Sequence, residues 1–131
     1  MAAENRILVV DDEQQIRDLY TQVFSGAGYQ VQTAASAEEA IEIMHKTPYW
    51  VMFLDLNLPG MNGVELCRQL RQEYPMAIAY AVTGYASLFE LSDCRAAGFE
   101  DYFTKPARLD DLLKAAAIGF ERVARWRRRS R

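Results

Sequence analysis

A run of five apolar residues that ends in a single aspartate constrains this chain more than any other feature. Trp50 to Leu54 is long enough for a strand buried on both faces and too short for a helix, which favours the centre of a parallel sheet. Asp55 follows at once, and a carboxylate at the end of a buried strand needs a metal, a cation or access to water. The turn sequence PGMNG at residues 59–63 puts Asp55 where strand gives way to loop, the edge of open α/β sheets at which ligands bind. We therefore predict that Asp55 is the working residue.

Strand and helix patterns alternate five times along the chain. Ser36, with Glu39 three residues later, predicts a capping box at the start of the second helix. This order predicts an α/β fold with a parallel sheet, right-handed crossovers and helices on both faces. The predicted strands lie at about residues 6–10, 29–33, 50–54, 76–82 and 101–104, and the predicted helices at about 13–27, from 36, 64–74, 87–97 and from 109 into the arginine-rich end.

Length and composition indicate one folded domain. The chain has 131 residues, of which half are hydrophobic and a quarter charged, close to the globular average. Its apolar runs are far below the ~20 residues that cross a bilayer, and residues 1–10 lack the pattern of a secretion signal, so we expect a cytoplasmic protein with no membrane contact. Cys67 and Cys94 lack metal-ligand spacing and the chain has one histidine, so we predict two buried thiols in a reducing compartment and no His/Cys metal site.

The end of the chain is strongly basic. It holds six of the fifteen basic residues, and the remainder of the chain has nine Lys/Arg against eighteen Asp/Glu. We predict an N-terminal arm at residues 1–5, a domain at 6–121 and a basic helical extension at 122–131. Three interpretations stay open: a solvated helix end, a linker to an effector domain, and, ranked last for want of a recognition helix, nucleic-acid binding. Trp126 is a candidate partner contact. The six basic residues are Arg122, Arg125, Arg127, Arg128, Arg129 and Arg131.

Polar side chains end four of the predicted strands. Asp11 and Asp12 follow the first strand, Asp55 the third, Thr83 the fourth and Lys105 the fifth. Parallel strands end at the same edge of a sheet, so these groups should share a pocket. Clustered carboxylates with no histidine or thiolate suit a hard cation, which predicts Mg²⁺. A carboxylate can also attack phosphorus to form an acyl phosphate, and a cation, a hydroxyl and an ammonium would stabilise that transfer.

Four motifs in the right order resemble the receiver domain of two-component response regulators, the CheY-like family. They are VVDDE at residues 9–13, LDLNLPGMNG at 54–63, VTG at 82–84 and AGFEDYFTKP at 97–106, and the likeness extends from about Arg6 to Glu121. The resemblance implies a flavodoxin-like, doubly wound (βα)5 fold with a five-stranded parallel sheet in the order 2-1-3-4-5. It also implies a signalling switch, which catalyses only its own phosphorylation and dephosphorylation.

The resemblance assigns the central roles to the acidic residues. Asp55 would be the phosphoacceptor, taking the phosphoryl group from the phosphohistidine of a sensor histidine kinase or a phosphotransfer protein. Asp12, Asp55 and the backbone carbonyl of Asn57 would bind Mg²⁺, with Asp11 contributing through water. Asn57 and Tyr85 would flank the path of the attacking water and influence the lifetime of the acyl phosphate.

The remaining roles concern the switch. Thr83 would bond a phosphoryl oxygen and move toward it, Tyr102 would follow by turning inward, and Lys105 would pair with another phosphoryl oxygen, aimed by a cis bond to Pro106. Gly84 at the fourth strand end could loosen this coupling. Other departures from the common family pattern are Asn62 and Ala107.

The expected output is the surface formed by the fourth helix, the fifth strand and the fifth helix. Three kinds of partner could bind that surface. They are a separate partner protein, an effector domain outside these residues, and a second copy of the chain in a homodimer formed on phosphorylation. The site residues also bear on two rival functions. A phosphohydrolase is disfavoured because the acidic pair at residues 11 and 12 is adjacent rather than Asp-x-Asp, and no insertion is long enough for a cap. A constitutive interaction module is disfavoured by the intact set of site residues.

Overall fold

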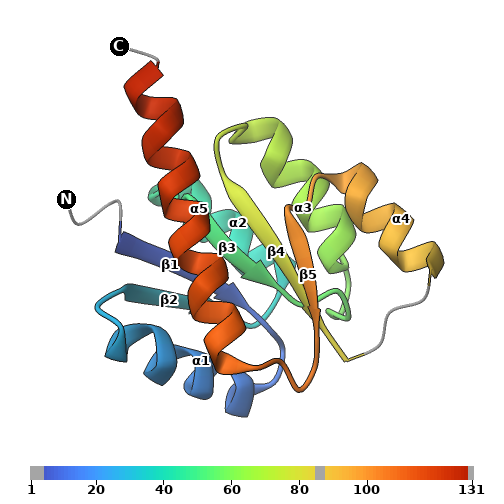
Figure 1. The fold of residues 1–131 in the computed structure, drawn as a ribbon. Coiled ribbons are helices and arrows are strands. Elements are labelled where there is room, and N and C mark those ends of the chain that lie inside the picture. Colours follow the sequence, from blue (N-terminus) through green and yellow to red (C-terminus); the bar gives the residue numbers. More distant parts are fainter. Residues whose placement is uncertain (1–4, 85–87, 130–131) are drawn as a thin grey trace.

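The computed structural model describes residues 5–84 and 88–129, which form one five-stranded parallel sheet with five helices (Figure 1). The strand order is 2-1-3-4-5, which confirms the predicted flavodoxin-like topology. Every adjacent pair of strands is parallel. The strands are β1 (Arg6–Val10), β2 (Gln30–Ala34), β3 (Val51–Leu54), β4 (Ile78–Thr83) and β5 (Asp101–Thr104), and the helices are α1 (Gln14–Gly26), α2 (Ala37–Lys46), α3 (Gly63–Glu73), α4 (Leu88–Ala97) and α5 (Leu109–Arg129).

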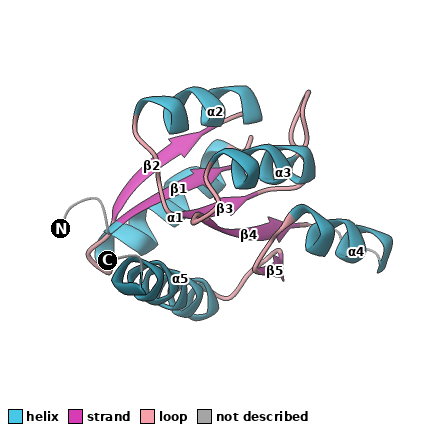
Figure 2. Ribbon diagram, turned by 90° about the horizontal axis from the view of Figure 1, so that it is seen from above, coloured by secondary structure: helices cyan, strands magenta, loops and turns pink. Residues whose placement is uncertain are grey.

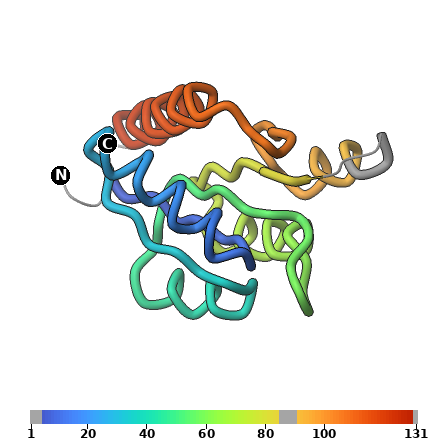
Figure 3. The backbone as a smooth tube through the Cα atoms, turned by 90° about the horizontal axis from the view of Figure 1, so that it is seen from below, coloured from blue at the N-terminus to red at the C-terminus, as the bar shows by residue number. Residues whose placement is uncertain are grey.

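Helices cover both faces of the sheet. Figure 2 shows α1 and α5 on one face and α2 and α3 on the other, with α4 beside α3, and the tube in Figure 3 follows the same layers from below. The core on the α1/α5 face is aromatic: the ring of Phe53 lies 4.9 Å from that of Phe24 and 5.1 Å from that of Tyr80. The hydroxyl of Tyr80 donates to the carbonyl oxygen of Ala115 in α5 (2.7 Å). Residues of β3 are therefore buried on both sides, as the apolar run predicts.

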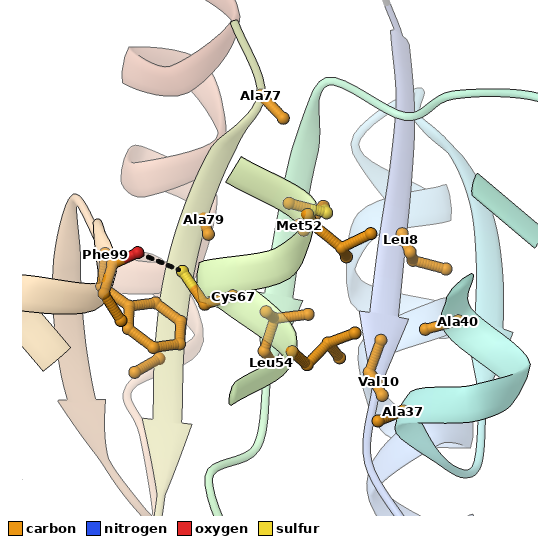
Figure 4. Packing of buried hydrophobic residues seen from close by; sticks show 14 of the residues in the cluster. Leu8, Val10, Ala37, Ala40, Met52, Leu54, Cys67, Ala77, Ala79 and Phe99 are labelled. Atoms are coloured by element: carbon orange, nitrogen blue, oxygen red, sulfur yellow. Dashed lines mark hydrogen bonds between the residues drawn. The ribbon is translucent and has the colours of Figure 1, made fainter. Parts of the chain in front are cut away.

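The other face contains both cysteines. Cys67 in α3 and Cys94 in α4 are free and buried, as predicted. Figure 4 shows Cys67 close to Phe99 and Ala79 within this core. Its thiol donates to the carbonyl oxygen of Ala97 (3.5 Å), and burial raises its pKa to about 12. Because thiolates are the reactive form, this packing makes Cys67 unreactive.

Alkylation of the native protein should accordingly be slow. At pH 8 we expect iodoacetamide to modify Cys67 and Cys94 far more slowly in native protein than in protein unfolded by guanidinium, because both thiols are buried and Cys67 stays protonated. Mass spectrometry of timed samples measures this. Equal rates in the native and unfolded protein would contradict the packing of α3 and α4 described here.

Local hydrogen bonds correct the sequence prediction at two helix starts. Ser36 caps α2 by accepting from the amide of Glu39 (3.2 Å), but the Glu39 carboxylate accepts from the amide of Ala35 rather than from that of the cap residue, so the predicted capping box is incomplete. A complete box lies instead at α3, where Asn62 and Glu65 exchange both bonds. The second and fourth strands also differ from their predicted ranges by one or two residues at each end, and span Gln30–Ala34 and Ile78–Thr83.

Helix α5 is longer than the core requires. It continues without a break through Glu121, the predicted domain boundary, to Arg129. Figure 1 shows α5 starting near the carboxyl ends of the strands and ending beyond their amino ends. The guanidinium of Arg127 lies 5.6 Å from the ring centre of Trp50, just before β3, and this contact holds the last turns against the sheet edge. Residues 122–129 are called the α5 overhang below.

Candidate functional site

The predicted acidic residues meet at the carboxyl edge of the sheet. Asp11 and Asp12 follow β1 and Asp55 follows β3, and oxygen atoms of all three carboxylates lie within 4.8 Å of one another. Asp11 and Asp55 are 2 % and 5 % exposed, while Asp12 faces solvent. The backbone places them: the amide of Asp55 donates to the carbonyl oxygen of Val10 (2.9 Å), which extends the β1–β3 ladder by one residue. Sheet-like hydrogen bonds, including that of the Asp11 amide to the carbonyl oxygen of Ala34 (3.1 Å), therefore fix the backbone of the two buried aspartates.

Lys105 supplies the cation that these carboxylates require. Its ammonium nitrogen lies 2.7 Å from Oδ2 of Asp11 and 3.2 Å from Oδ2 of Asp55, with Oε1 of the exposed Glu13 at 3.6 Å. The amide of Lys105 donates to the carbonyl oxygen of Thr83 (2.7 Å), and the bond to Pro106 is cis, as the resemblance implies. Two buried carboxylates thus share one ammonium, an arrangement that desolvated acids need.

Burial and charge shift the pKa values in this cluster. Burial raises the pKa of Asp55, and the charge of Asp11 adds to that rise, while the Asn57 amide and the Lys105 ammonium oppose it. Burial by itself would lower the pKa of Lys105, but its hydrogen bond to Asp11 and the charges of Asp11 and Asp55 outweigh burial and raise it. Lys105 is therefore a permanent cation at physiological pH.

Hydrogen bonds fix the orientation of the Asp55 carboxylate. Its Oδ1 accepts from the amide of Asn57 (3.1 Å), and its Oδ2 accepts from Lys105. The Asn57 side chain in turn donates to Oγ1 of Thr83 (3.4 Å), which is fully buried at the end of β4. Asn57 thereby links the third and fourth strand ends, a contact between side chains that the sequence analysis did not predict.

Gly63 allows the turn after Asp55 to close tightly. Its amide donates to the carbonyl oxygen of Leu56 (3.0 Å), and a Cβ at this position would overlap the carbonyl oxygen of Asp55 and lie 2.8 Å from the Cα of Leu56. Backbone atoms cannot give way as side chains do, so only glycine fits here. The motif contained this glycine, but its spacing could not reveal which backbone it approaches.

Substitution of that glycine should destabilise the fold. We expect Gly63→Ala to lower the free energy of unfolding by about 1 to 3 kcal/mol, the usual range for overpacking. Gly26→Ala is the matched control, because a Cβ there meets nothing within 4 Å. Urea unfolding followed by circular dichroism measures both variants. If Gly63→Ala is as stable as Gly26→Ala, the backbone of the turn after Asp55 can shift to accommodate a Cβ and this prediction is wrong.

The other predicted residues lie in different surroundings. Tyr102 on β5 is 38 % exposed, outside the carboxylate cluster, and its amide donates to Oδ1 of Asp101 (2.8 Å). Tyr85 lies outside the described residues. Two contacts were missed: Glu13 near Lys105, and Arg17, whose guanidinium donates to the carbonyl oxygen of Asp11 (2.8 Å). The sequence did contain a signal for the Arg17 contact. Residue 17 lies in the first turns of the predicted helix that follows Asp11 and Asp12, within reach of the strand end.

Known proteins are similar to this chain in sequence and in fold. The family model described as response regulator receiver domain matches residues 7–117. The alginate biosynthesis transcriptional regulatory protein AlgB of Pseudomonas aeruginosa is 35 % identical over 118 residues, which are 90 % of this chain but 26 % of AlgB. Sporulation initiation phosphotransferase F of Bacillus subtilis is 31 % identical over 110 residues, covering 84 % of this chain and 89 % of that protein.

A solved structure extends the likeness to three dimensions. The CheY-like response regulator receiver domain protein of Methanospirillum hungatei superposes with a TM-score of 0.89 at 32 % identity, covering 92 % of this chain and 97 % of that one. The chain thus spans about a quarter of AlgB and nearly all of the two smaller proteins. Among the described residues, none of the helices combines the length and the apolar character that spanning a bilayer demands.

Proposed function

This chain belongs to the response regulator receiver domains of two-component systems, and we propose that it switches when Asp55 accepts a phosphoryl group from the phosphohistidine of a sensor histidine kinase or phosphotransfer protein. The observation that carries the proposal is the pairing of one ammonium with two buried carboxylates at the carboxyl edge of the sheet. Asp55 there has an oriented carboxylate, and Lys105 supplies a positive charge where phosphoryl oxygens would arrive.

The donor set fits Mg²⁺. The three carboxylates offer oxygen atoms within 4.8 Å of one another, and all of the donors are hard. We assign Asp12, Asp55 and the backbone carbonyl of Asn57 as ligands, with Asp11 acting through water. Bound there, Mg²⁺ would supply positive charge to the transferring phosphoryl group and reduce repulsion among the carboxylates.

The residues of the chain would perform the transfer as follows. An oxygen of Asp55 attacks phosphorus in line, forming an O–P bond while the P–N bond of the phosphohistidine breaks and the imidazole leaves with the electron pair. Lys105 moves its hydrogen bond from Asp55 to a phosphoryl oxygen, and the hydroxyl of Thr83 donates to another. The chain catalyses only this reaction and its own dephosphorylation, in which Asn57 lies beside the path of attacking water.

Output would use the surface formed by α4, β5 and α5. Movement of Thr83 toward the phosphoryl group would draw the exposed Tyr102 inward, as the family resemblance implies. A groove of about 700 Å³ beside Tyr102 is lined by Cys94, Arg95 and Phe99 among others, and its shape would change with that movement. The protein or domain that binds this output surface is a separate partner protein, a second copy of the chain or an effector domain. Because AlgB is a transcriptional regulatory protein much longer than this chain, an effector domain is one of the arrangements to test. A cytoplasmic location stays a prediction.

Incubation with acetyl phosphate tests the proposal. With Mg²⁺ present, we expect one phosphoryl adduct per chain, stable in acid and labile in base, on the peptide that contains Asp55. Without a divalent cation the adduct should fall sharply, because the repulsion among carboxylates and phosphoryl oxygens is then unrelieved. An adduct on another residue, or the same yield in EDTA, would count against the assignment.

A further inference from the structure

The α5 overhang presents an exposed tryptophan on the face of the helix that elsewhere covers the sheet. Buried residues recur along α5 at Leu112, Ala116, Gly119 and Val123, at the three- and four-residue spacing of one helix face. Trp126 is the next position on that face, and it is 57 % exposed because the sheet has ended. A single exposed apolar side chain is ordinary on a protein surface, so Trp126 matters here because of the charged groups beside it. Tryptophan and arginine are among the residue types enriched at the energetic centres of protein interfaces.

Arginines surround this tryptophan. The overhang carries five arginines, and the nearest acidic residue on α5 is Glu121. Arg125 and Arg128 both lie 3.6 Å from Oε1 of Glu121, with side chains 53 % and 63 % exposed. Arg129 lies 5.7 Å from the ring centre of Trp126. Glu121, together with Glu100 beside Arg122, leaves the five guanidiniums only partly neutralised, so the overhang carries net positive charge beside an apolar ring.

The overhang is held in place on the domain. Arg122 forms an ion pair with Glu100 at 2.6 Å, and Arg127 stacks near Trp50. These two contacts hold the start and the later part of the overhang against the domain. The exposed side chains therefore project from a fixed helix. Preorganised side chains lose less conformational entropy when a partner binds.

We propose that the α5 overhang is a docking surface for a short acidic segment of a partner protein, with Trp126 as the apolar anchor and Arg125, Arg128 and Arg129 as the carboxylate contacts. Guanidiniums bind carboxylates in bidentate pairs, and tryptophan and arginine dominate binding energy at protein interfaces. Outside the overhang and Arg131, the chain has nine basic residues against eighteen acidic ones. An extended polyanion such as duplex DNA or an anionic bilayer would be repelled by that acidic body, whereas a short segment meets only the overhang.

This docking surface lies away from the carboxylate site. The strands carry Asp11 and Asp55 at their carboxyl ends, and α5 extends past their amino ends (Figure 1). Binding at the overhang is therefore compatible with a phosphodonor at Asp55. It would tether the domain to a partner regardless of phosphorylation, which is a role different from the output surface proposed above.

Fluorescence anisotropy with the full chain tests the proposal. The probe is a fluorescein-labelled peptide in which glutamates alternate with leucines, compared with the same peptide carrying lysines. We expect the acidic peptide to bind and the basic one not to bind. The triple variant R125Q/R128Q/R129Q should weaken binding by about tenfold, since each exposed ion pair contributes modestly. In a Trp50→Phe background Trp126 is the sole tryptophan, and its emission should shift on binding.

Three comparisons complete the test. Lys46→Gln/Arg68→Gln removes exposed charge from α2 and α3 and should bind the acidic peptide as the parent does, and Asp55→Asn should also bind it unchanged. If both peptides fail to bind, or the control variant loses as much affinity as the overhang variant, the proposal is wrong. Tighter binding of a DNA duplex or of phosphatidylserine vesicles than of the acidic peptide at equal salt would also overturn it. Circular dichroism of each variant establishes that α5 is still folded.

Discussion

Asp55→Asn should abolish phosphoryl labelling by acetyl phosphate and Mg²⁺ while the protein stays folded. Asparagine has the shape of aspartate but not the anionic oxygen that attacks phosphorus. The fold should tolerate the change, because the asparagine oxygen can still accept from the Asn57 amide and Lys105 keeps its 2.7 Å bond to Asp11. We expect the free energy of unfolding to change by no more than about 1.5 kcal/mol, the range for one hydrogen bond.

Asp18→Asn is the matched control for that variant. Asp18 is an exposed carboxylate on α1, so its replacement removes one negative charge from the chain without touching the cluster. The control should label like the parent protein in intact-mass measurements. Residual labelling of Asp55→Asn at the parent level would mean that the phosphoacceptor is another residue. Loss of labelling accompanied by unfolding would instead mean that Asp55 is mainly structural.

The place of the site was predictable because it follows from topology. Parallel strands all end at one edge, so the polar residues that end β1, β3, β4 and β5 had to lie near one another once the alternation of strands and helices was read. The same pattern predicted the two helical layers and the buried β3. Periodicity and the family motifs therefore predicted that Asp55 and Lys105 lie together, and their charged atoms are 3.2 Å apart.

The pairing inside the cluster was not predictable. Lys105 lies closer to Asp11 than to Asp55, across 94 residues of chain, and this choice depends on side-chain positions that no spacing encodes. The same holds for the overlap that a Cβ at Gly63 would cause. The capping box was misplaced for a different reason: Ser36 caps α2 as predicted, but the Glu39 carboxylate bonds the amide of Ala35, and the complete box forms at Asn62.

Lys105→Met should destabilise the protein more than any other single change at the site. It would leave Asp11 and Asp55, at 2 % and 5 % exposure, without the ammonium that bonds both. Removing one member of a buried charge group leaves the others uncompensated, so we expect a loss of about 3 kcal/mol in the free energy of unfolding. Phosphoryl labelling should also fall strongly, because the Lys105 ammonium no longer faces the phosphoryl oxygens and Mg²⁺ would be the one cation left to stabilise them.

A divalent cation should partly restore that variant. If the carboxylates bind Mg²⁺, the ion replaces the missing positive charge, and a ligand that binds only the folded state raises its stability. Thermal unfolding with increasing MgCl2 should therefore show a larger rise in Tm for Lys105→Met than for the parent protein. Lys114→Met, which removes an exposed ammonium from α5, is the control and should respond like the parent. If MgCl2 raises the Tm of all three proteins equally, the ion does not compensate for the missing ammonium and this prediction is wrong.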